Sequence, residues 1–427
     1  MKFKNLRNWH YKPISSITET ITDYVANGSF ATLKENTEYV ASSKFILIRL
    51  VDYNNNFNGE FKYITKESYE FLDKTKLFGG EIIISNVGAN AGTVFKTPYL
   101  KYKMSLGPNS IVVKTKENDD FYYYWFKSIY GQFSLDSIKT GSAQPKFNKT
   151  DFRKLLVPVP DILEQNRIAN ILNNLDGKIE VNNKIIANLE EQAQAIFKSW
   201  FIDFEPFQDG NFVESELGLI PEGWEVREVK DICDLKIGRT PPRKESEWFN
   251  DKKGIKWVSI KDMGNSDMYI SDTTEFLTEE AIDKFNIPLV EENTLILSFK
   301  LTVGRIAITS EKICTNEAIA QLKNPIINSL YLYFYFKNFS FETLGNTSSI
   351  GNAVNSKIIR ETKILIPNNK VLDQFLKSVK PISDFIRTLL NQNKKLAEIR
   401  DALLPKLMSG EIDVSNVKIK GEEVKNE

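Results

Sequence analysis

"FNKTDFRKLLVPVP", residues 147–160, is the stretch around which this 427-residue chain is organised. It joins a polar helix start to a short apolar run and two prolines, and a long helical pattern follows it. A degenerate copy, "VNSKIIRETKILIP", returns at 354–367, about 207 residues later, again ahead of a long helical pattern. Self-similarity at a fixed spacing indicates a structural repeat, so the sequence predicts one unit written twice.

Two further pairs of stretches align upstream in the same order. "KFILIRLVDYN" (44–54) matches "IKWVSIKDMGN" (255–265), and the Gly-containing stretch 64–95 matches 277–308. The three alignments superpose five pairs of residues: Asp52 and Asp262, Ser85 and Ser298, Gly92 and Gly304, Asn148 and Asn355, and Pro160 and Pro367. The order along the chain is therefore module, helix, module, helix.

Each module mixes short β-rich runs with turn clusters and one or two short helices, which predicts an α+β globular domain of roughly 150 residues. The aromatic helices at 119–133 and 329–339 are expected to be core stripes rather than surfaces that stack on bases. The predicted division has five parts: module one at 1–160, helix one at 161–205, linker and module two at 206–367, helix two at 368–410, and a flexible tail at 411–427.

The two long helices show apolar residues spaced by four and three, as in a coiled coil. The seam is predicted to contain Ile168, Leu172, Leu175, Ile179, Asn182, Ile186 and Leu189 in helix one, and Leu389, Asn393, Leu396 and Leu403 in helix two. Each seam carries one Asn, which either fixes register or is a tolerated defect. Two prolines, Pro381 and Pro405, are expected to kink or break helix two. Two similar modules on two similar helices predict an antiparallel pair with pseudo-twofold symmetry.

Composition excludes several classes of function. Lys plus Arg equals Asp plus Glu, 56 each, so strong non-specific nucleic-acid binding by the chain alone is not expected. One histidine, His10, gives no triad, metal site or His base, and "GANAG" (88–92) lacks the Lys and helix of a phosphate loop. The two cysteines, Cys233 and Cys314, are expected to be buried thiols in a reducing compartment. We therefore expect a cytoplasmic protein with no catalytic residues, no metal site and no membrane segment.

The chain resembles a known family, the specificity subunits of type I restriction-modification systems. The resemblance rests on the junction 141–172 with its Gln165, Ile168 and Leu172, on the helix ends 188–201 and 395–412, on "LIPEGWEVREVKDICDLKIGRTPPR" (219–243), and on 23–36 as a first-domain variant. It covers nearly the whole chain.

The resemblance implies that each module is a target-recognition domain and that the pair reads a bipartite stretch of double-stranded DNA. It also implies that the helices space the two halves and dock two methyltransferase subunits. Those partners would bind S-adenosylmethionine, and motor-nuclease subunits, if present, would bind ATP and Mg²⁺. No cofactor is implied for this chain.

The sequence also departs from the family. Module one lacks the usual Trp-x-x-x-x-Leu-Gly start, since "NWHYKPISSITETI" (8–21) is only loosely similar, and "SSIGNAVN" (348–355) lacks the Gln-Pro-Lys of the first junction. The two modules are therefore expected to read different half-sites, so an asymmetric target is predicted.

Candidate DNA contacts are donors and acceptors on the repeated loops, because base edges and phosphates are bound by such groups. In module one these are Asn27, Ser29, Ser85, Asn86, Asn90, Lys139, Thr140, Ser142, Gln144 and Lys146. In module two they are Arg239, Thr240, Arg243, Lys261, Lys300, Thr302, Arg305, Ser348, Ser349 and Asn352. Gln144 suits an adenine edge, and Arg239 or Arg305 a guanine edge. For each one, the alternative is a solvated loop or turn residue.

Two other functions stay open on the sequence alone. A coiled-coil adaptor that binds only proteins would give no sequence-specific DNA footprint in the presence of its partners. A stand-alone enzyme would need an acid–base or metal constellation, and it would act without partners.

Overall fold

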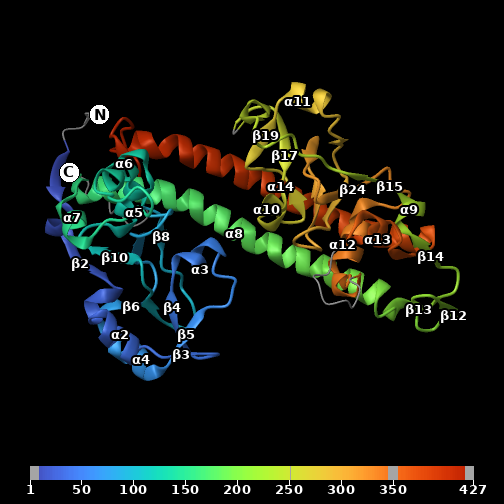
Figure 1. Cartoon of the computed structure of the whole chain (residues 1–427), viewed down its shortest axis with the longest axis horizontal. Helices are drawn as coiled ribbons and strands as arrows, with labels where there is room; N and C mark the ends of the chain where they lie inside the picture. The colour runs from blue at the N-terminus through green and yellow to red at the C-terminus, as the bar shows by residue number, and fades with distance from the viewer. Residues whose placement is uncertain (1–8, 251, 345–353, 419–427) are drawn as a thin grey trace. The chain divides into compact units, whose positions relative to one another are not determined.

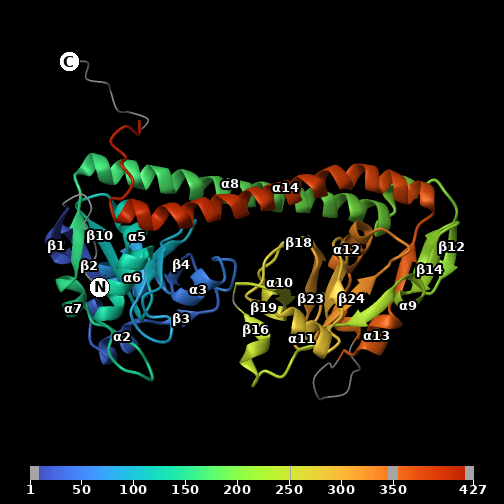
Figure 2. The ribbon, with the colours of Figure 1, turned by 90° about the horizontal axis from the view of Figure 1, so that it is seen from above.

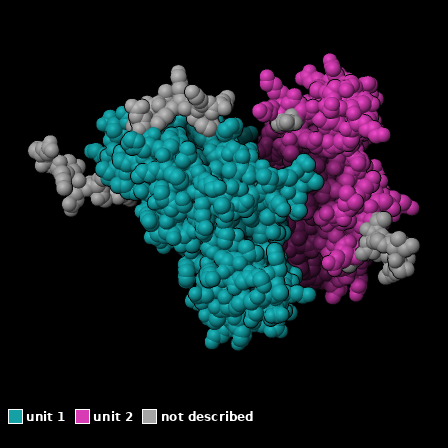
Figure 3. Space-filling model, turned by 60° about the vertical axis from the view of Figure 1, so that its left-hand side comes forward, with its two compact units in different colours: residues 1–181, 393–427 teal, residues 182–392 magenta. Residues whose placement is uncertain are grey.

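The computed structural model describes residues 9–250, 252–344 and 354–418. The chain forms two compact units, unit 1 from residues 1–181 with 393–427 and unit 2 from 182–392 (Figure 3). Two 40-residue helices, α8 (Ile162–Phe201) and α14 (Asn369–Met408), each contribute one part to unit 1 and the other part to unit 2. The predicted α+β class with two domains is confirmed. The predicted five-part division stays a prediction, because the compact units divide the helices between them.

Unit 1 is built on three sheets within the described residues (Figure 1). In sheet order, their strands are β1 (His10–Pro13) and β11 (Leu156–Val159); β2 (Thr18–Asp23), β10 (Ser110–Thr115), β7 (Ile82–Ser85) and β8 (Val94–Lys96); and β3 (Tyr39–Val40), β5 (Lys62–Ile64), β4 (Phe45–Ile48), β9 (Lys103–Leu106) and β6 (Lys76–Leu77). All pairs are antiparallel except β4 with β9.

Unit 2 repeats the same plan in its described part. Its strands, in sheet order, are β12 (Phe212–Ser215) and β13 (Gly218–Pro221); β14 (Glu225–Glu228) and β25 (Lys363–Ile366); β15 (Asp234–Ile237), β24 (Ile319–Lys323), β21 (Leu295–Ser298), β22 (Ile306–Thr309) and β18 (Tyr269–Ile270); and β16 (Phe249–Asn250), β19 (Glu275–Leu277), β17 (Ile255–Val258), β23 (Ile313–Thr315) and β20 (Leu289–Val290). The parallel pair β17 with β23 is the counterpart of β4 with β9.

Short helices connect these strands. Those of unit 1 are α1 (Ile14–Ile17), α2 (Phe30–Asn36), α3 (Leu50–Asn54), α4 (Lys66–Phe71), α5 (Asp119–Lys127), α6 (Ile129–Ser137), α7 (Lys149–Lys154), η1 (Tyr24–Asn27) and η2 (Asp73–Thr75). Those of unit 2 are α9 (Val229–Ile232), α10 (Ile260–Gly264), α11 (Glu279–Lys284), α12 (Ser329–Lys337), α13 (Ser356–Arg360), η3 (Glu205–Phe207), η4 (Ser246–Trp248) and η5 (Phe341–Leu344). The aromatic helices α5 and α12 are buried in the cores of their units, as predicted.

The repeat extends to individual hydrogen bonds. The Tyr122 hydroxyl donates to the carbonyl of Pro158 at 3.0 Å, and its counterpart Tyr331 donates to Leu365 at 2.6 Å. In the same way, Arg153 donates to a carbonyl at the start of unit 1, and Arg360 does so in unit 2. The tyrosine bonds satisfy carbonyls of β11 and β25, the strands that lead directly into the long helices, and the arginine bonds satisfy carbonyls of β2 and β15.

The aligned aspartates and the aligned asparagines have the same local role in both units. Asp52 and Asp262 are buried and accept from the backbone N–H three residues earlier, as the capping carboxylates of α3 and α10. Asn148 and Asn355 cap α7 and α13. The alignment made from the sequence is therefore correct at the level of side-chain function.

The two long helices run antiparallel within each unit (Figure 2). In unit 2 the Asn182 amide donates to Gln392 at 2.8 Å, while Phe197 packs against Phe375. In unit 1 Asp176 pairs with Arg400 at 2.7 Å. Later positions of α8 thus lie beside earlier positions of α14, as expected for an antiparallel pair.

The seam residues divide into two groups by burial. Buried are Ile168, Leu172, Asn182, Ile186 and Leu389; half-buried are Leu175, Ile179, Leu189, Asn393, Leu396 and Leu403. The Asn182 amide donates across the helices to Gln392, the residue before the seam Asn393.

The expected break in the second long helix is wrong. α14 is continuous from Asn369 to Met408 and passes through both Pro381 and Pro405. A proline inside a helix costs about 3 kcal/mol, because it removes one hydrogen bond and crowds the preceding turn. Around Pro381 that cost is offset by burial of Val379, Ser383 and Ile386 in the helix face that packs on unit 2.

Candidate nucleic-acid interface

In unit 1 the structure brings two of the predicted loops together. The Gly88 N–H donates to the carbonyl of Pro145 at 2.9 Å, and the Phe147 N–H donates to Asn86 at 3.1 Å. The Asn86 amide returns a bond to the Phe147 carbonyl at 3.1 Å. Loop 86–92 is therefore a support for loop 139–147, although some 50 residues separate them in the sequence.

Loop 139–147 presents its side chains to solvent. Thr140 and Lys146 exchange two backbone bonds of 2.8 and 2.9 Å, which closes the loop into a tight turn. The side chains of Ser142, Gln144 and Lys146 are exposed and make no hydrogen bond to the described part of the chain. These three residues are thus available for a ligand, whereas Lys139 pairs with Asp136 at 2.5 Å.

Other candidates in unit 1 serve its own structure. Asn27 bonds to Tyr24, Thr75 and Lys74, so its donors and its acceptor are engaged. Ser85 is 1% exposed and lies inside the sheet. The Ser29 hydroxyl caps α2, and the exposed Asn90 uses its backbone carbonyl to accept from Thr93.

An apolar cavity of about 680 Å³ lies beside the 86–92 loop. Phe30, which is 83% exposed, and Tyr39 line it together with Lys34. Two of its lining residues, Asn86 and Ser110, each keep one buried oxygen that has no hydrogen-bond partner. No sequence pattern singled out this cavity, since its wall comes from separate segments.

In unit 2 the predicted stretches meet around residues 315–319. The Arg239 N–H donates to the carbonyl of Thr315 at 2.8 Å, and the Phe299 N–H donates to Ala318 at 3.0 Å. The Thr240 hydroxyl bonds to the carboxylate of Glu317. The stretches 239–240 and 298–305 are therefore neighbours in unit 2, as loops 86–92 and 139–147 are in unit 1.

The three candidate arginines of unit 2 are held by internal contacts. The Arg243 guanidinium lies 4.4 and 4.5 Å from the ring centroids of Phe249 and Trp257, and it pairs with Glu275 at 2.7 Å. Arg239 donates to the Phe285 carbonyl at 2.6 Å, and Arg305 donates to Ile260 at 2.6 Å. Each arginine is thereby oriented, with fewer donors left for a ligand.

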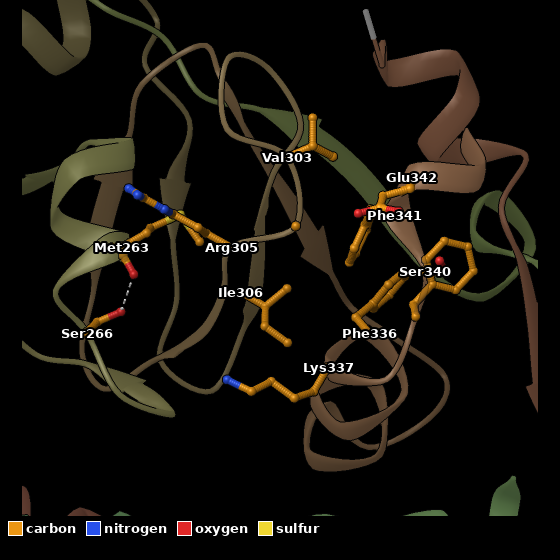
Figure 4. A pocket seen from close by; sticks show the side chains of 13 residues that line it. Met263, Ser266, Val303, Arg305, Ile306, Phe336, Lys337, Ser340, Phe341 and Glu342 are labelled. Carbon is orange, nitrogen blue, oxygen red and sulfur yellow. Dashed lines mark hydrogen bonds between the residues drawn. The ribbon is translucent and has the colours of Figure 1, made fainter. Parts of the chain in front are cut away.

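A cavity of about 610 Å³ lies between α10, β22 and the end of α12 (Figure 4). Arg305 and Lys337 reach it from different elements, and Phe336, Phe341 and Val303 form its apolar wall. Lys337 is a cation near the candidate loops that the sequence analysis missed, because its helix was interpreted only as core.

Lys261, Lys300 and Thr302 are exposed, as are Arg239 and Arg243. The Lys300 ammonium lies 5.5 Å from the centroid of the Phe299 ring. Ser348, Ser349 and Asn352 lie outside the described residues.

The loop that carries Lys300 is anchored at Ser298. The Ser298 hydroxyl donates to the Thr302 carbonyl at 2.6 Å and accepts from the Arg305 N–H at 3.0 Å. The Gly304 N–H donates to the Ser298 carbonyl at 2.9 Å, as the Gly92 N–H does to Ser85 at 2.7 Å in unit 1. The aligned Ser and Gly thus form one loop scaffold that occurs in both units.

Each module is fixed to both long helices. In unit 1 the Tyr124 hydroxyl donates to Asp176 at 2.8 Å, and Asp176 pairs with Arg400. In addition, Gln165 is fully buried and accepts from the Asn118 N–H at 3.1 Å. Burial raises the pKa of Tyr124, and the Asp176 charge raises it further, so the phenol stays a donor.

Unit 2 uses different residues for the same purpose. Glu190 of α8 accepts from the Met268 N–H at 2.7 Å, and burial raises the pKa of its carboxyl. On α14, Ser383 bonds to the Tyr269 hydroxyl, and Arg387 stacks 4.4 Å from the centroid of the same ring. The loops of each unit therefore have a fixed position on the helix halves that belong to that unit.

The remaining chemical groups give no further site in the described residues. Both cysteines are buried, and burial raises the pKa of each thiol to about 12. The described ranges contain no cluster of His, Cys, Asp and Glu that could hold a metal ion. None of the helices in those ranges has the length and apolar character needed to cross a membrane.

Comparison with known proteins agrees with this architecture. The family model of the type I restriction modification DNA specificity domain matches twice, at residues 7–191 and 221–401. The chain is 28% identical to the type I restriction enzyme MjaIX specificity subunit of Methanocaldococcus jannaschii, over 96% of this chain and 95% of that one. It is also 28% identical to the HindI specificity subunit of Haemophilus influenzae, over 66% and 74% respectively.

A solved structure shows the same fold. The S subunit of the type I restriction-modification system from M. genitalium aligns over 95% of this chain and 98% of its own length, with a TM-score of 0.52 at 17% identity. Because the family model matches both halves and covers most of the sequence, this chain belongs to the family of type I restriction-modification specificity subunits.

Proposed function

We propose that this specificity subunit recognises a bipartite, asymmetric sequence in double-stranded DNA, with one half read by each unit. One observation carries the proposal: the two units share a loop scaffold, at Ser85–Gly92 and Ser298–Gly304, but place different side chains on it. Equal scaffolds support equal placement of the loops within each unit, and unequal loops support unequal half-sites.

The long helices would set the distance between the half-sites. Both helices run without a break from one unit into the other, and 40 residues of α-helix extend about 60 Å. Half-sites one turn of B-DNA apart lie about 34 Å from each other. In addition, the contacts of each module with both helices keep its loops from moving independently of them.

Two methyltransferase subunits are the proposed partners of the helices. They would supply S-adenosylmethionine and the methyl-transfer chemistry, and motor-nuclease subunits, where present, would add ATP and Mg²⁺. The net charge of zero supports this division of labour, because a chain without a basic excess gains phosphate contacts from partners that close around the DNA.

Methylation mapping of the host genome with and without this gene tests the function. The expected result is the loss of one bipartite adenine-methylated motif on deletion. No change in any motif, in a strain where the methyltransferase subunit co-purifies with this chain, would contradict the proposal.

A loop variant tests the assignment of unit 1. Gln144→Ala combined with Lys146→Ala should relax one half of the motif and leave the other half unchanged, because both side chains are exposed and free of internal contacts. Lys101→Ala, exposed in a different loop of the same unit, is the matched control and should leave both halves intact. A motif that stays unchanged in the double variant removes this loop from the interface.

A further inference from the structure

The tip of the 298–304 loop in unit 2 is an isolated apolar residue. Leu301 is 97% exposed, the highest value among the large hydrophobic residues described, and its φ is +62°. The left-handed region is unfavourable for a non-glycine residue, and an exposed leucine gains nothing from burial to offset that cost. Strained, exposed positions of this kind cluster where a ligand is bound.

The loop holds this leucine in a defined place. Ser298, before the tip, bonds through its hydroxyl to the backbone of Thr302 and Arg305 after the tip, and the Gly304 N–H donates to the Ser298 carbonyl and closes the loop at its base. Val303, two residues after the tip, lines the cavity beside α12 (Figure 4). Leu301 is therefore presented by a closed scaffold and is not a residue of a loose segment.

The neighbours of Leu301 have the character of a DNA contact. Lys300 and Thr302 flank it, both exposed, and Arg305 follows at the start of the next strand. Cations and hydroxyls are the side chains that bind phosphates, and an apolar side chain between them can reach the methyl group of thymine. A protein partner would instead need a patch near 800 Å² on this side, whereas Leu301 is a single apolar residue.

We infer that Leu301 is a specificity-determining residue that contacts the 5-methyl group of a thymine in the half-site read by unit 2. The inference rests on the proposed function and adds to it a residue and the chemical group it reads. Unit 1 has no such tip, because the same scaffold there carries "NVGANA" (86–91) with Ala89 and Asn90 exposed. The two units would then differ in how they discriminate A·T pairs.

The test replaces thymine by uracil, which removes only the methyl group. The complex of this chain with its methyltransferase subunit is titrated with duplexes that carry the mapped motif, each with uracil at one thymine of the half-site. Burial of one methyl-sized group is worth a factor of about four in affinity. Replacement of the contacted thymine by uracil should therefore weaken DNA binding by the wild-type complex about four-fold. The same replacement should leave the DNA affinity of the Leu301→Asn complex unchanged.

The variant itself separates binding from folding. Asparagine tolerates the left-handed conformation, so Leu301→Asn should keep or raise the melting temperature while it weakens DNA binding at least about four-fold. Ile326→Asn, 64% exposed in another loop of unit 2, is the matched control and should leave the uracil effect intact.

Two results would overturn the inference and leave the proposed function standing. One is equal sensitivity of wild type and Leu301→Asn to every uracil. The other is weaker assembly with the methyltransferase subunit at unchanged DNA affinity, which would make the tip a protein contact. Failure of the wild-type complex to prefer the motif would contradict the proposed function itself, before any variant is compared.

Discussion

Units 1 and 2 show how one framework supports two different surfaces. In both units a buried aspartate caps the short helix that follows the parallel strand, α3 in unit 1 and α10 in unit 2. In both units a tyrosine also donates to a carbonyl of the strand that precedes the long helix, β11 or β25. They differ at the loop tips, where unit 1 carries Gly, Ala and Asn and unit 2 carries Lys, Leu and Thr. The shared residues are therefore those that position the loops, and the differing residues are those that solvent reaches.

The contacts of the modules with the helices differ as well. Unit 1 combines the network of Tyr124, Asp176 and Arg400 with the apolar packing of α8 on its core. Unit 2 combines the hydrogen bonds of Glu190 and Ser383 with a large aromatic cluster around Phe375. Equivalent truncations in the two units should therefore have unequal effects.

The largest expected difference concerns one position of the repeat, Phe375 in α14 and Ile168 in α8. Phe375 is fully buried against Phe197, Phe201 and Tyr331, so Phe375→Ala should lower the free energy of unfolding of unit 2 by about 3–5 kcal/mol. Ile168→Ala should lower that of unit 1 by about 2–4 kcal/mol. Amide hydrogen exchange, followed separately in β24 and β10, measures both effects. Equal loss of protection in both strands would show that the units do not unfold independently.

A second comparison concerns the glycines of the shared loop scaffold. Both have positive φ, +96° at Gly92 and +90° at Gly304, so an alanine at either should cost about 1–2 kcal/mol from the backbone alone. A Cβ at Gly304 would lie 2.7 Å from the ring of Phe341, whereas at Gly92 it would meet the flexible end of Lys139 at 3.0 Å. Gly304→Ala should therefore be the more damaging, at about 2–3 kcal/mol, as judged by urea titration of the complete chain. The reverse order would mean that Phe341 moves aside more easily than Lys139.

The smallest expected effect concerns pH and Glu190. Burial raises the pKa of this carboxyl above 4.5, and the Met268 N–H and Lys337 only partly counter that rise. The folded state then binds a proton more tightly than the unfolded state, so stability increases as pH falls through the raised pKa and levels off below 4.5. Glu190→Gln keeps an acceptor for Met268 and should stabilise unit 2 at neutral pH by no more than about 1 kcal/mol. Thermal unfolding at pH 7.0 and near the ordinary pKa should show this advantage shrink on acidification, and a growing advantage would contradict it.

The sequence predicted the regular parts of the fold well because they depend on local pattern. The strands at 45–48, 82–85 and 295–298 lie where the apolar runs placed them, and the two long helices follow their seam. The predicted break at Pro381 and Pro405 was wrong, because packing of α14 outweighs the local cost of proline. Such a balance depends on contacts from distant segments, which periodicity does not contain.

The candidate site was predicted less completely, for a related reason. Residue type identified Ser142, Gln144 and Lys146, which are exposed, but also Asn27 and Ser85, whose side chains hold the unit together. Leu301 was missed because no sequence rule places a leucine in a left-handed turn, and Lys337 because its neighbours indicated only a core helix. For each of these candidates, contact with DNA stays a prediction.

The pairing of β1 with β11, and of β14 with β25, has a consequence for how such a chain can change. Each module begins and ends at one pair of adjacent antiparallel strands, so its two ends lie side by side just before the long helix that follows. A segment whose ends meet in this way can be exchanged as a cassette: a replacement has only to bring its first and last strands together. New recognition surfaces can then be acquired in a single recombination step, while the helices stay as they are.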